Sequence, residues 1–183
     1  MKKIIYLSVL MVFGLTVNAQ KIVPLEKKHD YNFINRNEKI YFKDVNNILG
    51  KYLGTWIGAH GNKKYEFRIT KSIRIFQTMK FDRLLISYIV SDLTGNIIEN
   101  TTSLPESSNY IMKGLQYYNN GYYLNYVAKG GNCAQSGQIL IYVDNKTMDV
   151  IFRHEADFVD LTECPTSINQ YFPASVIFKL MKQ

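Results

Sequence analysis

From residue 54 onward the chain alternates apolar and polar residues with a period of two. Successive side chains of a β-strand point to opposite faces of a sheet, so each alternating run predicts a strand with one buried face. The predicted strands cover residues 65–69, 84–90, 122–126, 139–143, 148–152 and 176–180. Short segments of turn composition separate several of them, at 59–62, 92–96, 119–121 and 144–146. The pattern therefore indicates an antiparallel meander.

Before these strands the apolar residues follow a different spacing. They recur at three- and four-residue intervals, as on one face of a helix: Tyr41, Phe42, Val45, Ile48, Leu49, Tyr52 and Leu53. Asp44 is suited to cap the N-terminus of a helix, and Gly54 is suited to end it. The sequence thus predicts one amphipathic helix of two to three turns, from Asp44 to about Tyr52.

A meander of about eight strands with one short helix must protect its edges, because unpaired edges promote aggregation. Closure into a barrel removes the edges altogether. We therefore expect an all-β, antiparallel, up-and-down β-barrel with one short N-terminal helix, in which the last strand pairs with the first. A two-sheet sandwich is the alternative arrangement of the same strands.

Gly54, Thr55 and Trp56 follow the predicted helix directly. A helix that runs into Gly-x-Trp resembles the opening motif of the lipocalins and the wider calycin superfamily, over residues 44–58. The resemblance implies a lipocalin-like barrel with the helix plugging one end, where Gly54 and Trp56 have structural roles. The layout also resembles exported bacterial domains of unknown function with the same opening.

The chain departs from the lipocalin pattern in two places. It has no turn of the Thr-Asp-Tyr kind, and Arg153 is the one late arginine that could stand in for the arginine that lies against the tryptophan in that family. Avidin-type barrels also open on Gly-Thr-Trp, and the resemblance implies a biotin cage with several tryptophans. Trp56 is the only tryptophan here, so we do not expect biotin binding.

Residues 1–19 have the layout of a secretory signal peptide. Lys2 and Lys3 precede an apolar stretch at 4–17, and small residues at 17–19 form the exit. The stretch is shorter than the roughly 20 residues that a membrane-spanning helix needs. We expect an exported mature protein, periplasmic or extracellular, with no membrane span.

The mature chain is expected to have a polar leader or linker at 20–39, or a flap packed on the domain, and a single barrel domain at 40–183. Loss of two lysines with the signal peptide lowers the net charge from +7 to +5. Its basic residues are spread out, apart from a patch of Lys27, Lys28, Arg36 and Lys39. A nucleic-acid partner is not expected from this distribution, whereas attraction of the patch to anionic lipid headgroups or polysaccharide stays open.

The chain has two cysteines, Cys133 and Cys164. In an exported protein an isolated pair is most simply one structural disulfide. Its loop of about 30 residues would contribute roughly 3–4 kcal/mol in the chain-entropy model. A catalytic thiol would need a neighbouring base and a reducing compartment, so we predict the disulfide.

Residues that commonly carry chemistry do not form a known catalytic or metal-binding pattern. His29, His60 and His154 lack the spacing that lets two histidines share zinc, and there is no nucleophile elbow or phosphate loop. The densest acidic cluster lacks the spacing of a calcium loop, and we interpret it as a solvated loop: Glu155, Asp157, Asp160 and Glu163. We expect no cofactor, no metal and no enzymatic activity.

The chain is rich in tyrosine, with 14 residues. Inward tyrosines suit a cavity for an amphipathic ligand, and they equally suit a packed core. Two functional hypotheses follow. One is a non-enzymatic module that binds a small apolar or amphipathic ligand in the barrel, among Tyr110, Tyr122, Leu124 and Tyr126. The other is a filled barrel that acts through its outer surface, as an envelope interaction protein or an inhibitor of another exported protein.

Overall fold

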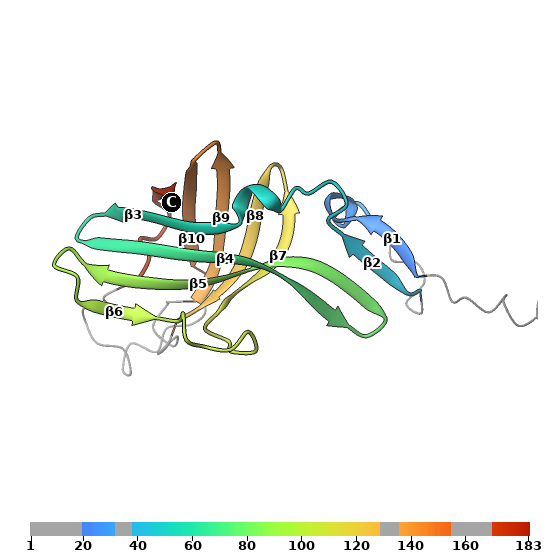
Figure 1. Cartoon of the computed structure of the whole chain (residues 1–183), viewed down its shortest axis with the longest axis horizontal. Helices are drawn as coiled ribbons and strands as arrows, with labels where there is room; N and C mark the ends of the chain where they lie inside the picture. The colour runs from blue at the N-terminus through green and yellow to red at the C-terminus, as the bar shows by residue number, and fades with distance from the viewer. Residues whose placement is uncertain (1–19, 32–37, 129–135, 155–169) are drawn as a thin grey trace, which may run out of the picture.

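The computed structural model of the protein describes residues 20–31, 38–128, 136–154 and 170–183 (Figure 1). Within these ranges the chain forms β-strands and two short 3₁₀ turns, η1 (Leu25–Lys27) and η2 (Gly50–Tyr52). The strands are β1 (Lys21–Pro24), β2 (Ile40–Lys43), β3 (Gly54–His60), β4 (Lys63–Phe76), β5 (Met79–Asp92), β6 (Ile97–Asn100), β7 (Met112–Tyr118), β8 (Gly121–Val127), β9 (Ser136–Asp144), β10 (Thr147–His154) and β11 (Ile177–Lys182).

Eight of these strands close into an antiparallel barrel, in the order β3-β4-β5-β7-β8-β9-β10-β11. Two short ladders complete the ring. Strand β11 pairs with β3 through Met181↔Ile57 and Lys182↔Trp56, and β5 pairs with β7 through Leu85↔Lys113 and Ile86↔Met112. The predicted all-β class and closed eight-stranded barrel, with the last strand against the first, are confirmed.

The predicted helix from Asp44 to Tyr52 is wrong, since the described residues contain no α-helix. Instead, Asp44 accepts hydrogen bonds from the backbone N–H groups of Ile48 (2.7 Å) and Leu49 (3.3 Å). Asn47 lies in the left-handed region, at φ 52°. A short acidic side chain that bonds nearby backbone competes with helix formation, and a left-handed residue interrupts a right-handed helix. The helical spacing of apolar residues comes from a strand followed by turns.

The barrel interior is packed with aromatic side chains. The largest fully buried ones are on several strands and on the segment before β11: Trp56, Phe67, Tyr88, Tyr122, Tyr126, Phe152 and Phe172. Phe172 brings its ring centroid to 4.9 Å from Tyr126, 5.4 Å from Tyr88 and 5.8 Å from Phe67. The tilted and edge-to-face arrangements of these rings are the favourable ones for aromatic pairs.

Trp56 lies in the core at the beginning of the barrel, on β3. The side chain is fully buried, and its Nε1 donates to the backbone oxygen of Tyr52 at 2.8 Å. The cation that lies over its ring is Lys182 of β11, with Nζ 5.3 Å from the centroid, whereas Arg153 is exposed on β10. Gly54, at φ +114°, begins β3 in a conformation that suits glycine.

Strands β1 and β2 and the turn η1 form an N-terminal arm outside the barrel (Figure 1). Strand β2 lies parallel to β1 and to the beginning of β5, and the Phe42 and Phe81 rings stack at 5.3 Å. Part of the segment expected to be a polar leader or flap is thus ordered on the outside of the sheet. Among the described residues, no helix has the length and apolar character needed to cross a membrane.

Candidate functional site

The candidate site lies where β5 changes partners along one of its edges. The beginning of β5 pairs with β2 at Lys80 and Phe81, and the middle pairs with β7 at Leu85 and Ile86. Between these two ladders, residues 82–84 have no strand on this side in the described structure. The backbone N–H of Leu84 instead donates to the hydroxyl of Tyr122, at 3.2 Å.

A cleft of about 110 Å³ opens on the outer side of this gap. We call it the arm cleft, because the N-terminal arm forms one wall and β4, β5 and β7 form the others. Its lining residues are Leu25, Lys28, Arg74, Phe76, Phe81, Asp82, Arg83, Gly114 and Leu115. The cleft combines three cationic side chains with apolar and aromatic ones.

Irregularity of β7 contributes to one wall of the arm cleft. The register of β7 against β8 shifts between Gly114 and Gln116, which is the mark of a β-bulge at Leu115. The backbone oxygen of Leu115 accepts a hydrogen bond from Lys28 Nζ at 2.7 Å. A Cβ on Gly114 would lie 2.4 Å from the Tyr122 hydroxyl oxygen, so glycine is what allows Tyr122 to reach β5.

The cations of the arm cleft are close enough to influence one another. Burial lowers the pKa of Lys28, and the charge of Arg74 lowers it further. Burial also lowers the pKa of Arg83, with Arg74 adding to the effect, while Glu106 partly offsets it. The pKa of Lys113 is lowered by burial and by Arg83. In each case burial is the larger cause and a neighbouring cation the smaller one.

The carboxylates nearest to this cluster have other partners. Glu106 accepts a hydrogen bond from Ser72 Oγ at 2.9 Å, and Asp82 belongs to a separate network described below. The Nε of Arg83 is buried and has no hydrogen-bond partner among the described residues. Buried polar groups are normally hydrogen-bonded, so this donor is an exception in the described structure.

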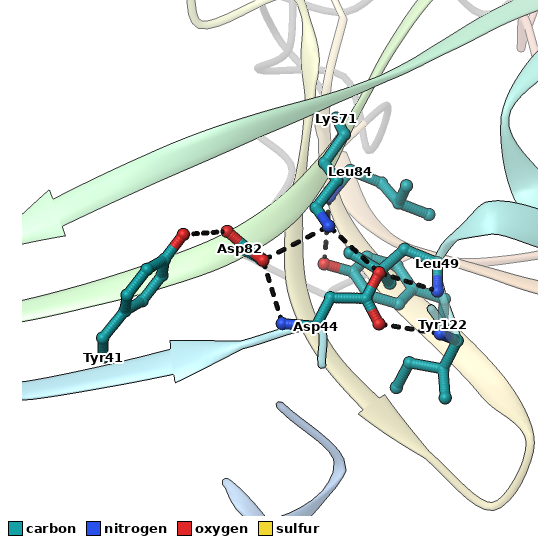
Figure 2. Close-up of polar contacts among 8 residues, drawn as sticks. Tyr41, Asp44, Leu49, Lys71, Asp82, Leu84 and Tyr122 are labelled. Atoms are coloured by element: carbon teal, nitrogen blue, oxygen red, sulfur yellow. Dashed lines mark hydrogen bonds and ion pairs between the residues drawn. The ribbon is translucent and has the colours of Figure 1, made fainter. Parts of the chain in front are cut away.

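Four residues at the base of the arm form what we call the Asp44–Asp82 network (Figure 2). Asp82 accepts hydrogen bonds from the Tyr41 hydroxyl at 2.7 Å and from the backbone N–H of Asp44 at 2.9 Å. Lys71 Nζ lies 3.1 Å from an oxygen of Asp44 and 3.3 Å from an oxygen of Asp82. The network joins β2, β4 and β5, and thereby fixes the arm against the hairpin that carries Arg74 and Arg83.

The protonation of this network follows from its contacts. Burial alone would raise the pKa of Asp82, but the hydrogen bonds from Tyr41, Asp44 and Lys71 outweigh it and hold the pKa below its ordinary value. Burial and the bond to Asp82 raise the pKa of Tyr41 to about 12. For Lys71, burial acts to lower the pKa, and the two carboxylates raise it overall. At neutral pH the network therefore holds an ionised Asp82 and a protonated Lys71.

The interior residues that the sequence suggested as ligand contacts are only partly brought together. Tyr122, Leu124 and Tyr126 share the inward face of β8 and are at most 1% exposed. Tyr110 is half-buried in the loop before β7 rather than on that strand. The three residues of β8 contact the core, as in the edge-to-face pair of Tyr126 with Phe152 at 5.4 Å.

The described residues contain no group of three or more His, Cys, Asp or Glu side chains that could hold a metal ion. His29 packs against Tyr118, and His60 packs against Phe178. Cys133 and Cys164, with the predicted disulfide, lie outside the described residues, as do Arg36 of the basic patch and the acidic cluster of Glu155, Asp157, Asp160 and Glu163.

Sequence reasoning identified Lys28 as part of a basic patch and missed Arg74 and Arg83. Each of the two arginines lies within an apolar run, Arg74 at 73–76 and Arg83 at 81–86. A charged residue at the outward position of a strand is usually a solvated one. In the sequence, Arg74 and Arg83 therefore look like the solvated, outward-facing residues of ordinary strands.

Comparisons with known proteins give a family and no function. A search of curated proteins and a search of solved structures each found no match. A family model matches residues 1–162, and its description is "Family of unknown function (DUF6705)". The matched range includes the arm and all barrel strands except β11. The chain belongs to this family of unknown function, and its domain is an antiparallel β-barrel.

Proposed function

We propose that the protein is a non-enzymatic binding protein and that its site is the arm cleft, which takes a small amphipathic anion. The observation that carries the proposal is the set of three cations, Lys28, Arg74 and Arg83, on one cleft. The carboxylate that lines the same cleft, Asp82, and the nearby Glu106 have other hydrogen-bond partners. An anion would relieve the repulsion among these cations and would supply an acceptor for Arg83 Nε.

The volume of the arm cleft limits what it can hold. At about 110 Å³ it is smaller than the roughly 300–1,000 Å³ of pockets that enclose drug-sized ligands. A carboxylate or phosphate group would fit inside, and an attached apolar chain would have to lie along the rim. Phe76, whose side chain is 47% exposed, lines the cleft and offers that apolar surface.

Packing of the barrel supports an outer site over an interior one. A ligand among Tyr122, Leu124 and Tyr126 would have to displace side chains that already contact the core, and interiors this well packed resist such changes. The arm cleft requires no such displacement. The proposed ligand is amphipathic, as in the hypothesis of a ligand-binding module. The proposed site is on the outer surface, as in the hypothesis of a filled barrel. We expect the protein to act after export.

Loss of Arg83 should weaken binding strongly. Charge-assisted hydrogen bonds contribute about 1.5–3 kcal/mol, so Arg83→Gln is expected to lower the affinity for octyl phosphate or octanoate about 10-fold or more. Isothermal titration calorimetry measures this, with octyl glucoside as the uncharged ligand. Comparison of the phosphate and the carboxylate shows which headgroup the cleft prefers.

The control for this variant is Lys64→Gln, which removes an exposed lysine at the opposite end of β4. It should leave both affinities unchanged. Equal binding of octyl glucoside, or equal losses in Arg83→Gln and Lys64→Gln, would contradict an anion site in the arm cleft.

Binding should also depend on pH through Lys28. The free protein has a lowered Lys28 pKa, and a bound anion favours the charged lysine and so raises that pKa. Affinity is therefore highest when Lys28 is protonated in the free protein, and it falls as pH rises through the lowered pKa. Octanesulfonate, whose own charge is constant, is the suitable probe. Lys28→Gln should bind it more weakly and flatten the pH profile, and an unchanged profile in this variant would assign the titration to another group.

A further inference from the structure

Strand β4 is longer than the strand beside it. Its pairing with β3 ends at Ile69, opposite Gly54, whereas its pairing with β5 continues without a register shift to Phe76. In the described structure, residues 70–76 thus have ladder partners on one side only. Figure 1 shows this part of the β4–β5 hairpin extending away from the barrel.

The free edge at residues 70–76 also carries exposed apolar side chains. Ile73, Ile75 and Phe76 are 53%, 68% and 47% exposed. Natural edge strands are normally protected by charged residues, prolines or bulges. Here the segment has no proline, Lys71 is drawn toward Asp44 and Asp82, and Arg74 lies over the Phe76 ring at 5.4 Å. The edge therefore combines exposed apolar side chains with backbone that has no ladder partner on this side in the described structure.

The two faces of this edge differ in chemistry, because side chains alternate along a strand. Ile73 and Ile75 lie on one face. Arg74 lies on the other, where it lines the arm cleft together with Lys28 and Arg83. A strand added here would meet aliphatic side chains on one face and positive charge on the other.

We propose that the free edge of β4 at residues 70–76, which we call the β4 edge, binds an extended acidic segment of a partner protein by strand addition. The segment would alternate aliphatic residues, which contact Ile73 and Ile75, with Asp or Glu, which approach Arg74. Main-chain hydrogen bonds supply affinity in this mode of recognition, and the alternating side chains supply specificity.

Charge favours an acidic partner over a second copy of this chain. Residues 70–76 contain no carboxylate. Lys71 is already paired with Asp44 and Asp82, so Arg74 is the cation that this edge presents to a partner. Pairing of two β4 edges would bring cations of both copies together, and like charges on facing strands are destabilising. An acidic residue opposite Arg74 would instead form an attractive cross-strand pair.

The proposal is tested with a seven-residue peptide that alternates glutamate with valine, observed by NMR on the full-length mature protein. We expect shift changes and slowed amide exchange at residues 70–76. Replacement of glutamate by lysine in the peptide should weaken binding at least 10-fold. Ile75→Asp should abolish binding, since it places a negative charge among the aliphatic contacts. Ile177→Asp changes an isoleucine of similar exposure, 58%, on β11, and should leave binding intact.

Several results would overturn the proposal: shift changes located elsewhere, equal binding of the lysine peptide, or equal losses in the two isoleucine variants. Concentration-dependent dimerisation of the free protein that Ile75→Asp removes would assign the edge to a second copy instead. The outcome is separable from that of the arm cleft. We expect Ile75→Asp to bind octyl phosphate normally and Arg83→Gln to retain the peptide.

Discussion

Replacement of Asp82 by alanine is expected to lower the free energy of unfolding by about 2–4 kcal/mol. The carboxylate accepts bonds from Tyr41 and from the backbone of Asp44, and pairs with Lys71. Its removal leaves the Tyr41 hydroxyl and the Asp44 N–H without this acceptor, while Lys71 keeps its contact with Asp44. Removal of one partner of a buried pair costs about 3–5 kcal/mol. The range is reduced because the Lys71 side chain is 35% exposed, so water screens part of the interaction.

Urea unfolding followed by the fluorescence of Trp56, the only tryptophan, measures this change. Asp149→Ala is the matched control, because it breaks an exposed pair with Lys179 whose side chains are 37% and 65% accessible. Such pairs contribute about 0–1 kcal/mol. A loss in Asp82→Ala no larger than that in Asp149→Ala would contradict a stabilising role for the network.

The loss of stability in Asp82→Ala should also depend on pH. The pKa of Asp82 is lower in the folded protein than in the unfolded chain, so its contribution is complete above the unfolded pKa and is lost as pH falls through the folded pKa. The stability difference between the native protein and Asp82→Ala should therefore be largest near neutral pH and should shrink on acidification below about pH 4.

Replacement of Gly58 by alanine is expected to destabilise the protein by about 3 kcal/mol or more. A Cβ at this position would lie 2.2 Å from the backbone oxygen of Lys179 and 3.1 Å from the Cα of Leu180. Overpacking of a core usually costs about 1–3 kcal/mol. We expect the upper end or beyond, because backbone atoms cannot rotate away and the ladder that joins β3 to β11 is short.

Gly95→Ala separates steric conflict from backbone strain. Gly95 has φ +98°, and a Cβ added there would meet no atom within 4 Å. Its replacement should cost about 1–2 kcal/mol through the backbone alone. Thermal or urea unfolding of both variants decides the matter: if Gly58→Ala is no less stable than Gly95→Ala, the two strands can separate there at little cost.

The two proposed binding surfaces share a structural origin in the β4–β5 hairpin. Each of its strands has 14 residues, which is about twice the length of β3, with 7. The hairpin therefore extends past the barrel. The N-terminal arm covers part of one edge through β2 and leaves the arm cleft, while the other edge, at residues 70–76, stays open.

The relationship to lipocalins stays a prediction.

Most of the barrel could be predicted because its determinants are local. On β10 and β11 the buried residues alternate with more exposed ones, and the turn between β7 and β8 is formed by Asn119 and Asn120 at φ 48° and 60°. Asparagine tolerates this left-handed backbone better than most residues. The two-residue period of buried side chains and the residues of the turn together specify an antiparallel strand pair, and both are local features of the sequence.

The helix prediction failed because its competitor is distant in sequence. Asp44 has the spacing of a helix N-cap, and it does accept backbone N–H bonds, but its own backbone N–H is bound by Asp82, 38 residues away. That bond and the left-handed Asn47 make turns more favourable than a helix. Tertiary contacts routinely override helical propensity of this size.

The sequence by itself determined most of the barrel strands and several of their turns, because hydrophobic period and turn residues act between neighbours in the chain. Closure was expected from the need to protect sheet edges, and the long-range ladders of β3 with β11 and of β5 with β7 produce it. Only the tertiary structure decided where binding chemistry could lie. Lys28 and Leu115 are 87 residues apart and in contact, and Arg74 and Arg83 join them from two further strands. The β4 edge is open because the pairing of β3 with β4 reaches only as far as Ile69. Convergence of side chains from separate strands is set by register and packing, which no local pattern encodes.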